Sequence, residues 1–334
     1  MKAQRCVLLS VNGMQQSRRN FLMGALTGAA ALCVPGSVEA AQRGATRLQN
    51  IKSDRKLKKS VKLALSSYCY WHFADIKYPM EKVITNASEL GVDVEVLHRQ
   101  LESEDKAYLN NLKLHAFHSG VDLCCLSIHQ GFVYTDKEKL KQMVDHTKHC
   151  IELAYMMGIP SIRLNSGRWN TIKTFDELME ARGIEPAIPG YTEDDAFKMC
   201  IDCIGECIPT AKECGVVLNL ENHWGLTNSP EGVIRIVEAV NSPWLGMMCD
   251  TGNFLENPYD KIAKLAPRIG YMHAKTYYGG GEWYTLDLDY DRIAKIVTDA
   301  GYSGYVGLEF EGKEDAATGV PKSIAMLRKA FQLN

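Results

Sequence analysis

The stretch VVLNLENHWG (residues 216–225) is a short apolar run that ends at an acidic residue, Glu221, before a polar loop. Three later stretches repeat this arrangement: LGMMCDTGNF (245–254) ends its run at Asp250, IGYMHAKTYY (269–278) at His273 and YVGLEFEG (305–312) at Glu309. The four polar residues lie 29, 23 and 36 positions apart, about one strand and one helix per step. Each therefore sits where a buried parallel strand runs out into its following loop.

The same alternation of strand and helix begins at residue 60 and predicts the whole fold. We expect eight strands, at residues 61–67, 92–97, 121–128, 161–166, 216–221, 245–250, 269–274 and 305–310, with helices between them. Eight such units predict a (β/α)8 barrel of the TIM type, an α/β fold with a single domain. An open doubly wound sheet would need a glycine-rich phosphate loop after its first strand, and SSYCYWHF (66–73) contains no glycine.

The barrel prediction also predicts a site. The loops after the strands ring a single mouth, so Glu221, Asp250, His273 and Glu309 are expected to converge there. Three carboxylates and one imidazole favour a hard or borderline divalent cation. We expect one metal ion, with Mn²⁺ as the first choice and Mg²⁺, Co²⁺ or Zn²⁺ as alternatives. Taken singly, each residue is equally explained as a polar residue that ends a strand.

The N-terminus has the features of an export signal. Residues 17–22 (SRRNFL) resemble the twin-arginine motif, an apolar stretch follows, and residues 38–40 (VEA) offer a cleavage site after Ala40. We expect a signal peptide at residues 1–40, a polar linker at 41–59 and the barrel domain at 60–334. The mature protein is expected to be periplasmic or otherwise extracytoplasmic, free of the membrane, with the twin-arginine translocase as its partner during export. A disordered arm with a chance arginine pair is the alternative.

The composition argues against several partners. The net charge of −2 gives no electrostatic reason to expect nucleic acid or an anionic membrane as a partner.

Cys200, Cys203 and Cys207 fall on one helical face, a spacing typical of small residues packed on a sheet, although a soft-metal site shows it too. Four histidines fall in predicted helices and are expected to be surface or packing residues: His115, His118, His146 and His149.

Two loops are candidates for covering the mouth. Residues 168–191, between the fourth strand and its helix, form a long loop that carries Trp169, and residues 277–284 form an aromatic, glycine-rich loop that carries Trp283. Loops this long in compact domains often act as lids or binding elements. Their aromatic rings suit the apolar C–H faces of sugars, and ordinary anchoring of the loops is the alternative explanation.

Several strings in this chain resemble those of one superfamily. ENHWG, CDTGN, MHAK and GLEFEG, with IRLNSG after the fourth strand, are similar to the sugar isomerase/epimerase superfamily with the xylose-isomerase-like barrel. That superfamily includes ketose 3-epimerases, inosose dehydratases and apurinic endonucleases, and the resemblance covers residues 60–330. It implies four metal ligands, Glu221, Asp250, His273 and Glu309.

The resemblance also implies catalytic roles. Glu221 and Glu309 would stand on opposite faces of the substrate as acid and base. Glu311 shares a strand face with Glu309, and the family pattern favours Glu309. Several members carry a second histidine three residues after the sixth-strand aspartate, where this chain has Asn253. That histidine supports a multinuclear zinc site in the nucleases, so its loss argues against action on DNA.

Further residues near the predicted strand ends are expected to bind substrate. They are His129 after the third strand, Arg163 in the fourth, His223 two residues past Glu221 and Lys275 two residues past His273. Lys275 is equally explained by a salt bridge to a ligand carboxylate, and Arg163 by bracing the ring of carboxylates. His98, after the second strand, is also considered.

Three functions remain open. The first is a divalent-metal-dependent isomerase or epimerase that removes a proton beside the carbonyl of a keto-sugar and passes through an enediolate. The second is an exported lyase or dehydratase that shares this first step and then eliminates a β-substituent from a 3-keto-glycoside or an inosose-like substrate. The third is a non-catalytic carbohydrate-binding barrel, whose expected sign would be a lost ligand. A homo-oligomer in which the partner closes the mouth is compatible with each.

Overall fold

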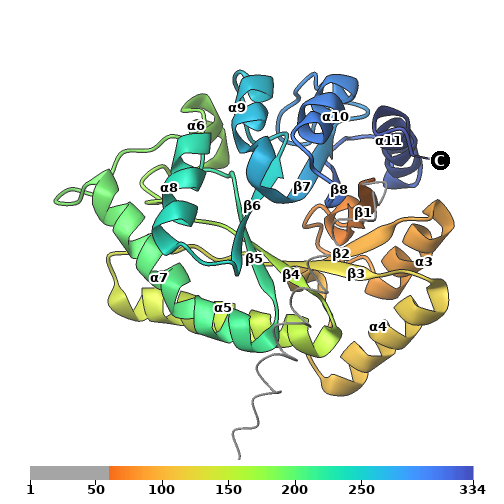
Figure 1. Cartoon of the computed structure of the whole chain (residues 1–334), viewed down its shortest axis with the longest axis horizontal. Coiled ribbons are helices and arrows are strands. Elements are labelled where there is room, and N and C mark those ends of the chain that lie inside the picture. Colours follow the sequence, from red (N-terminus) through yellow and green to blue (C-terminus); the bar gives the residue numbers. More distant parts are fainter. Residues whose placement is uncertain (1–59, 334) are drawn as a thin grey trace, which may run out of the picture. The chain divides into compact units, whose positions relative to one another are not determined.

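The computed structural model describes residues 60–333, and eight parallel strands form the predicted closed barrel (Figure 1). Each strand pairs with the next, and β1 pairs with β8 to close the ring. The strands are β1 (Lys62–Ser66), β2 (Asp93–Leu97), β3 (Leu123–Ser127), β4 (Ser161–Leu164), β5 (Val217–Glu221), β6 (Leu245–Asp250), β7 (Ile269–Thr276) and β8 (Tyr305–Phe310). The predicted signal peptide and linker, residues 1–59, lie outside the described residues.

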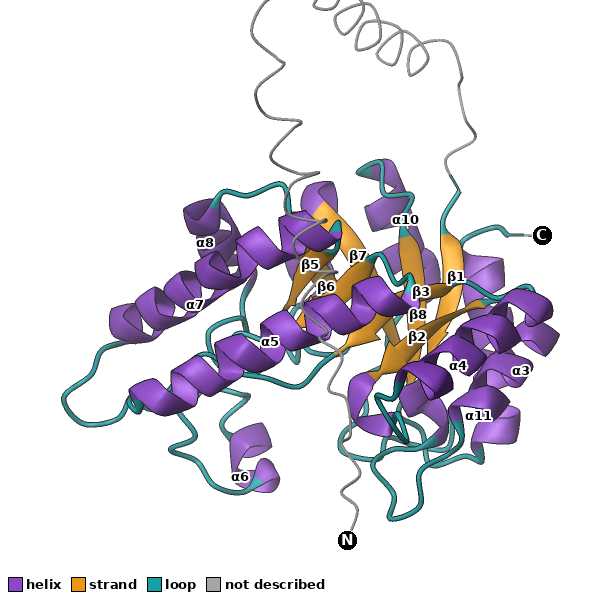
Figure 2. Cartoon of the chain, turned by 90° about the horizontal axis from the view of Figure 1, so that it is seen from below, coloured by secondary structure: helices purple, strands orange, loops and turns teal. Residues whose placement is uncertain are grey.

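Helices surround the strands, and α5 and α7 run side by side along the barrel (Figures 1 and 2). The α-helices are α3 (Met80–Leu90), α4 (Lys106–Ser119), α5 (Lys137–Met157), α6 (Phe175–Glu180), α7 (Glu193–Cys214), α8 (Pro230–Val240), α9 (Pro258–Leu265), α10 (Tyr290–Asp299) and α11 (Ala316–Ala330). Short 3₁₀ turns are η1 (Ser67–Tyr70), η2 (His98–Gln100) and η3 (Ala266–Arg268). No helix among the described residues combines the length and the apolar character that a membrane crossing requires.

Local sequence explains where the helices begin and end. The Asp136 side chain accepts hydrogen bonds from the first backbone amides of α5, and Gly158 ends that helix in the left-handed conformation that glycine adopts without strain. Thr192 and Asp195 form a capping box at the start of α7. A second capping box, Thr174 with Glu177, starts α6 inside the segment that the sequence predicted as a plain loop.

The strands are buried on both faces, as a barrel covered by helices requires. One large apolar cluster fills the space between strands and helices, and three of the four cysteines of α7 are buried in it. Cys200, Cys203 and Cys207 are therefore packing residues, as predicted, and every cysteine among the described residues is free. A smaller cluster around Tyr271 fills the barrel interior, where Tyr271 packs against the backbone at Gly307.

Candidate active site

Glu221, Asp250 and His273 meet at the carboxyl ends of β5, β6 and β7. All three are fully buried, and one ligand atom from each lies within 4.8 Å of those of the other two. Nδ1 of His273 lies 3.0 Å from Oε1 of Glu221 and 4.0 Å from Oδ2 of Asp250. Strand pairing sets this geometry, because Asp250 and His273 are register partners across β6 and β7.

This group fits a divalent cation. Asp250 Oδ2 is buried and accepts no hydrogen bond, and the Lys275 ammonium lies 3.3 Å from it, so this oxygen retains capacity for a metal ion. Two carboxylates and one imidazole are also a donor set that binds Mn²⁺, Mg²⁺ or Zn²⁺. Glu309 lies outside the three-residue group, so its role as a fourth ligand stays a prediction.

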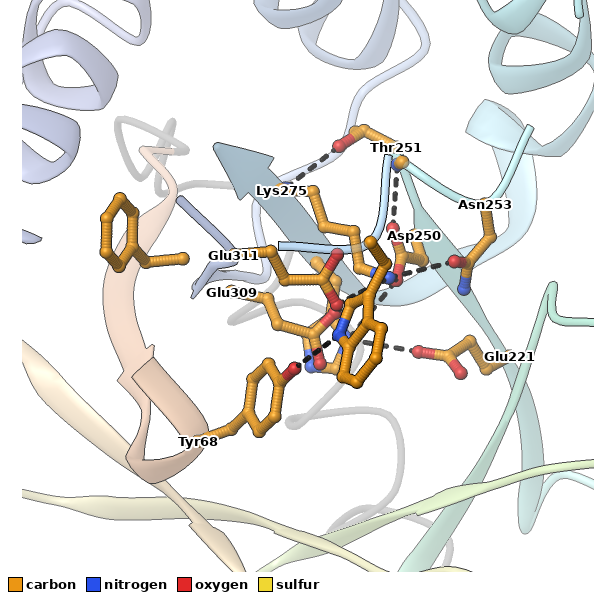
Figure 3. Close-up of polar contacts among 12 residues, drawn as sticks. Tyr68, Glu221, Asp250, Thr251, Asn253, Lys275, Glu309 and Glu311 are labelled. Atoms are coloured by element: carbon orange, nitrogen blue, oxygen red, sulfur yellow. Dashed lines mark hydrogen bonds and ion pairs between the residues drawn. The ribbon is translucent and has the colours of Figure 1, made fainter. Parts of the chain in front are cut away.

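Lys275 connects this group to Glu309. Its ammonium lies 3.3 Å from a carboxylate oxygen of each of three residues, Asp250, Glu309 and Glu311, and donates a hydrogen bond to Asn253 Oδ1 at 2.9 Å. Figure 3 shows Lys275 between Asn253 on one side and the two glutamates on the other. The salt bridge that the sequence allowed for Lys275 is therefore formed, and its side chain also lines the cavity described below.

Glu309 in β8 and Glu311 directly after it differ in their protonation. Burial alone would raise the pKa of Glu309, but Lys275 and His273 outweigh burial and lower the pKa to about 2. Burial dominates at Glu311 and raises the pKa of that carboxyl to about 7. The two carboxyls therefore face one cavity with different proton affinities.

Arg163 braces Glu221. Its Nη2 donates a hydrogen bond to Oε2 of Glu221 at 2.6 Å, and both side chains are buried. Burial alone would raise the pKa of Glu221, but the Arg163 guanidinium helps to hold it well below its usual range. Arg163 also lines the cavity, so the bracing contact does not exclude contact with a ligand.

Glu95 is the residue that sequence reasoning missed. It lies on β2, is fully buried, and accepts a hydrogen bond from Nε2 of His273 at 2.7 Å. Metal-binding histidines usually donate their second nitrogen to a carboxylate in this way. Burial alone would lower the pKa of His273, but Glu95 and Glu309 raise it well above the ordinary value. The available signal was an acidic residue inside the apolar run VDVEVL.

The loop after β6 is held closely in place. Asn222 uses its side chain to accept from the backbone amide of Asp250 at 2.7 Å and to donate to the Asp250 carbonyl at 2.9 Å. Gly252 donates its amide to Asp250 Oδ1 at 2.7 Å. A Cβ at Gly252 would lie 2.4 Å from side-chain atoms of Lys275 and Tyr277, so only glycine fits this close approach.

A cavity of about 360 Å³ opens above these residues, within the ~300–1,000 Å³ range of ligand pockets. Six aromatic side chains line it and are here called the aromatic wall: Tyr68, Phe73, Phe175, Trp224, Trp283 and Tyr284. Phe175 belongs to α6, and Trp283 and Tyr284 belong to the loop after β7, so both loops singled out in the sequence contribute. Nε1 of Trp283 donates a hydrogen bond to the Tyr68 hydroxyl at 3.3 Å, and Figure 3 shows Tyr68 on the same side of the site as Glu309 and Glu311.

The four predicted substrate-binding residues all line this cavity: His129, Arg163, His223 and Lys275. Desolvation by the cavity walls lowers the pKa of His129, although its surface is exposed to the cavity, to about 3 and that of the half-buried His223 to about 4, so both imidazoles are neutral near pH 7. A neutral imidazole both donates and accepts a hydrogen bond, which suits sugar hydroxyls. His98 does not line the cavity.

Comparison with known structures gives the same fold. A 3-keto-D-glucoside 4-epimerase from E. coli matches with a TM-score of 0.64 and 16% identity, over 80% of this chain and 99% of that one. A D-psicose 3-epimerase from Clostridium cellulolyticum H10, solved with D-tagatose, matches with a TM-score of 0.61 and 17% identity, over 81% and 97% of the two chains. An L-ribulose 3-epimerase matches with a TM-score of 0.61 and 18% identity, over 81% and 92%.

At these identities the likeness establishes the fold alone. No curated protein sequence matches the chain. The model of one protein family does match, over residues 84–330, which is most of the barrel. This chain belongs to the xylose isomerase-like TIM barrel family.

Proposed function

We propose that this protein is a divalent-metal-dependent isomerase or epimerase that moves a proton beside the carbonyl of a keto-sugar. The observation that carries the proposal is the contact between the Glu221–Asp250–His273 group and two cavity-lining cations, Arg163 and Lys275. A cation-binding group thereby borders a cavity that is large enough for a sugar and lined with aromatic rings. Sugar-modifying enzymes with this fold are among the similar solved structures.

The roles of the residues follow from their charges. A divalent cation held by Glu221, Asp250, His273 and Glu309 would act as a Lewis acid on the substrate carbonyl. Glu221 and Glu309 are both ionised at neutral pH, so either can take the proton from carbon. The glutamate on the opposite face must first take a proton from solvent before it can return one to carbon. Lys275 then donates a hydrogen bond to the substrate oxygen on which negative charge develops.

Proton NMR in D₂O tests this proposal. The purified protein, supplied with Mg²⁺ or Zn²⁺, is incubated with a panel of ketoses and 3-keto-glucosides. Deuterium should enter at the carbon beside the carbonyl with the skeleton retained, and Glu309→Gln should abolish the exchange. A protein that binds the same sugar but exchanges no proton, with or without metal, would be a carbohydrate-binding barrel instead.

The aromatic wall favours a second candidate, a lyase that acts on a 3-keto-glycoside. A ring beyond the reacting sugar needs an apolar surface, and Trp283, half-exposed at the rim, supplies one. Trp283→Ala should raise KM for a 3-keto-glucoside more than for a free ketose, with kcat little changed. Phe117→Ala, an exposed aromatic on α4, is the matched control. Release of the aglycone with formation of an enone would identify the lyase.

We also propose, from residues 17–40 alone, that the protein is exported by the twin-arginine pathway. Transport in a folded state would allow the cation to be loaded before export. Replacing the pair with lysine (Arg18→Lys together with Arg19→Lys) should leave the protein in the cytoplasm of a host with that pathway, as cell fractionation measures. Unchanged export of this variant would contradict the proposal.

A further inference from the structure

A second group of metal-ligating side chains lies outside the cavity. It consists of His98 in η2 and of His146 and Cys150, which are one turn apart on α5. Cys150 Sγ lies 3.9 Å from Nδ1 of His98 and 3.7 Å from Nε2 of His146. One ligand atom from each residue lies within 4.8 Å of the others. The sequence predicted His146 to be a surface or packing residue, and its half-buried ring does pack against the ring of His98.

These separations are close to those of a tetrahedral zinc site. Zinc binds sulfur at ~2.3 Å and imidazole nitrogen at ~2.0–2.1 Å, so sulfur and nitrogen ligands at the tetrahedral angle lie ~3.6 Å apart. The two sulfur–nitrogen distances in this group exceed that value by only a few tenths of an ångström. The two ring nitrogens of His146 lie 3.8 and 3.7 Å from Sγ, so a rotation of this half-buried ring would direct one of them at the ion.

Glu104 orients the first imidazole. Its Oε1 accepts a hydrogen bond from Nε2 of His98 at 2.7 Å, which leaves the Nδ1 lone pair of His98 facing Cys150. The other oxygen of Glu104 accepts from Nε2 of His149 at 2.6 Å. A carboxylate behind a histidine is the usual support of a metal ligand, because it fixes the tautomer and the ring orientation.

Burial and access also fit an ion. Cys150 is fully buried, whereas the His98 side chain is 13% exposed and His146 is half-buried. The sulfur is thus shielded from solvent while the imidazole side offers an entry path. Three protein ligands leave one coordination position for water.

We propose that His98, His146 and Cys150 form a second cation site that binds a borderline ion such as Zn²⁺, with Glu104 as the positioning residue. When the ion binds, the Cys150 thiol releases its proton to solvent and the sulfur forms the bond to zinc. Sulfur and nitrogen donors distinguish this site from the oxygen-rich group at the barrel mouth, which favours harder ions.

The site would fasten one wall of the cavity. It joins η2, which directly follows β2, to α5. The residues before and after His98 in sequence both contact the cavity or its wall. Leu97 lines the cavity, and the Arg99 guanidinium lies 5.4 Å from the centre of the Phe73 ring in the aromatic wall. An ion at this point would hold η2 against α5 and restrain that wall.

Cobalt spectroscopy of the full chain tests the proposal. The protein is stripped of metal with a chelator and titrated with Co²⁺, which gives a near-ultraviolet charge-transfer band only when a thiolate is a ligand. The barrel-mouth group contains no sulfur, so cobalt bound there is silent in this band. We expect the band in the wild type and its loss on adding Zn²⁺. No thiolate band at saturating Co²⁺ would overturn the proposal.

Variants locate the ion. Cys150→Ala should abolish the band, whereas Cys214→Ala, at a half-buried cysteine of α7, should keep it. Glu104→Gln should lower the affinity for Co²⁺ by ~10–100-fold, the usual cost of losing a supporting carboxylate. Because Glu104 is partly exposed, this variant tests the site even if Cys150→Ala does not fold. A band that survives Cys150→Ala, or an affinity unchanged in Glu104→Gln, would contradict the assignment.

Discussion

Glu95 and His273 are joined through the barrel interior by a hydrogen bond of 2.7 Å between Oε2 and Nε2. Because this bond leaves Nδ1 of His273 facing Glu221 and Asp250, we expect Glu95→Gln to weaken Mn²⁺ binding by ~10–100-fold. Isothermal titration of metal-free protein measures the affinity. Asp93→Asn, at the other end of β2, is the control and should bind Mn²⁺ like the wild type. Equal affinities for Glu95→Gln and the wild type would exclude a supporting role for Glu95.

The Lys275 ammonium lies 3.3 Å from each of three buried carboxyl groups, so its removal should destabilise the metal-free protein. Lys275→Met leaves buried charges unpaired, and such a loss typically costs ~3–5 kcal/mol of unfolding free energy. Mn²⁺ should reduce this cost, because a dication replaces the lost positive charge. Urea unfolding with and without Mn²⁺ measures both values. Lys62→Met, which removes an exposed ion pair, should cost at most ~1 kcal/mol. A cost for Lys275→Met that Mn²⁺ does not change would contradict this account.

Gly252 should not tolerate a side chain. In Gly252→Ala the new methyl group would lie 2.4 Å from Cδ of Lys275, and overpacking of this kind costs ~1–3 kcal/mol. Displacement of Lys275 should also lower activity in the D₂O exchange assay. Gly205→Ala is the matched control, because nothing lies within 4 Å of its new Cβ, and it should stabilise α7 by ~0.5–1 kcal/mol. Similar stability of the two variants would show that the loop after β6 relaxes freely.

His129 should make stability depend on pH. Desolvation by the cavity walls lowers the pKa of His129 to about 3, whereas an unfolded histidine titrates near ~6.5. Between these values only the unfolded chain binds the proton, so this contribution to stability is present above pH ~6.5 and is lost as the pH falls. His129→Gln should therefore lose less stability than the wild type between pH 7 and pH 5 in urea unfolding. His129 is open to the cavity, so solvent screening reduces the effect.

The control for this pH dependence is His118→Gln, at an exposed position of α4. It removes one histidine without touching the cavity, and it should follow the wild type at each pH. If His129→Gln and His118→Gln behave alike, His129 does not carry the acid sensitivity.

The barrel was predictable because its signals are local. Each strand is a short apolar run, and the polar residue that ends it, such as Glu221 or Asp250, lies at the same end of every unit. The eight predicted strands are confirmed in order and nearly in length. Convergence of three predicted ligands followed from topology alone, since the ends of parallel strands share one mouth.

The contacts that tune the site were not predictable, because they join residues distant in sequence. Glu95 lies 178 positions before His273, and no spacing rule connects them. The pairing of His98 with Cys150 depends in the same way on how η2 packs against α5. The helix α6 was missed because it is only six residues long, and its capping box was the one local sign of it.

Pairing of β8 with β1 closes the barrel and also completes the candidate site. β1 gains its second neighbouring strand only when β8 is in place, and β8 carries Glu309 and is followed directly by Glu311. Loop closure across most of the domain is slow compared with local pairing. Pairing of β8 with β1 therefore closes the barrel and brings both glutamates to the site in one step, and a chain that stops before β8 would lack both the β1–β8 pairing and these two carboxyls.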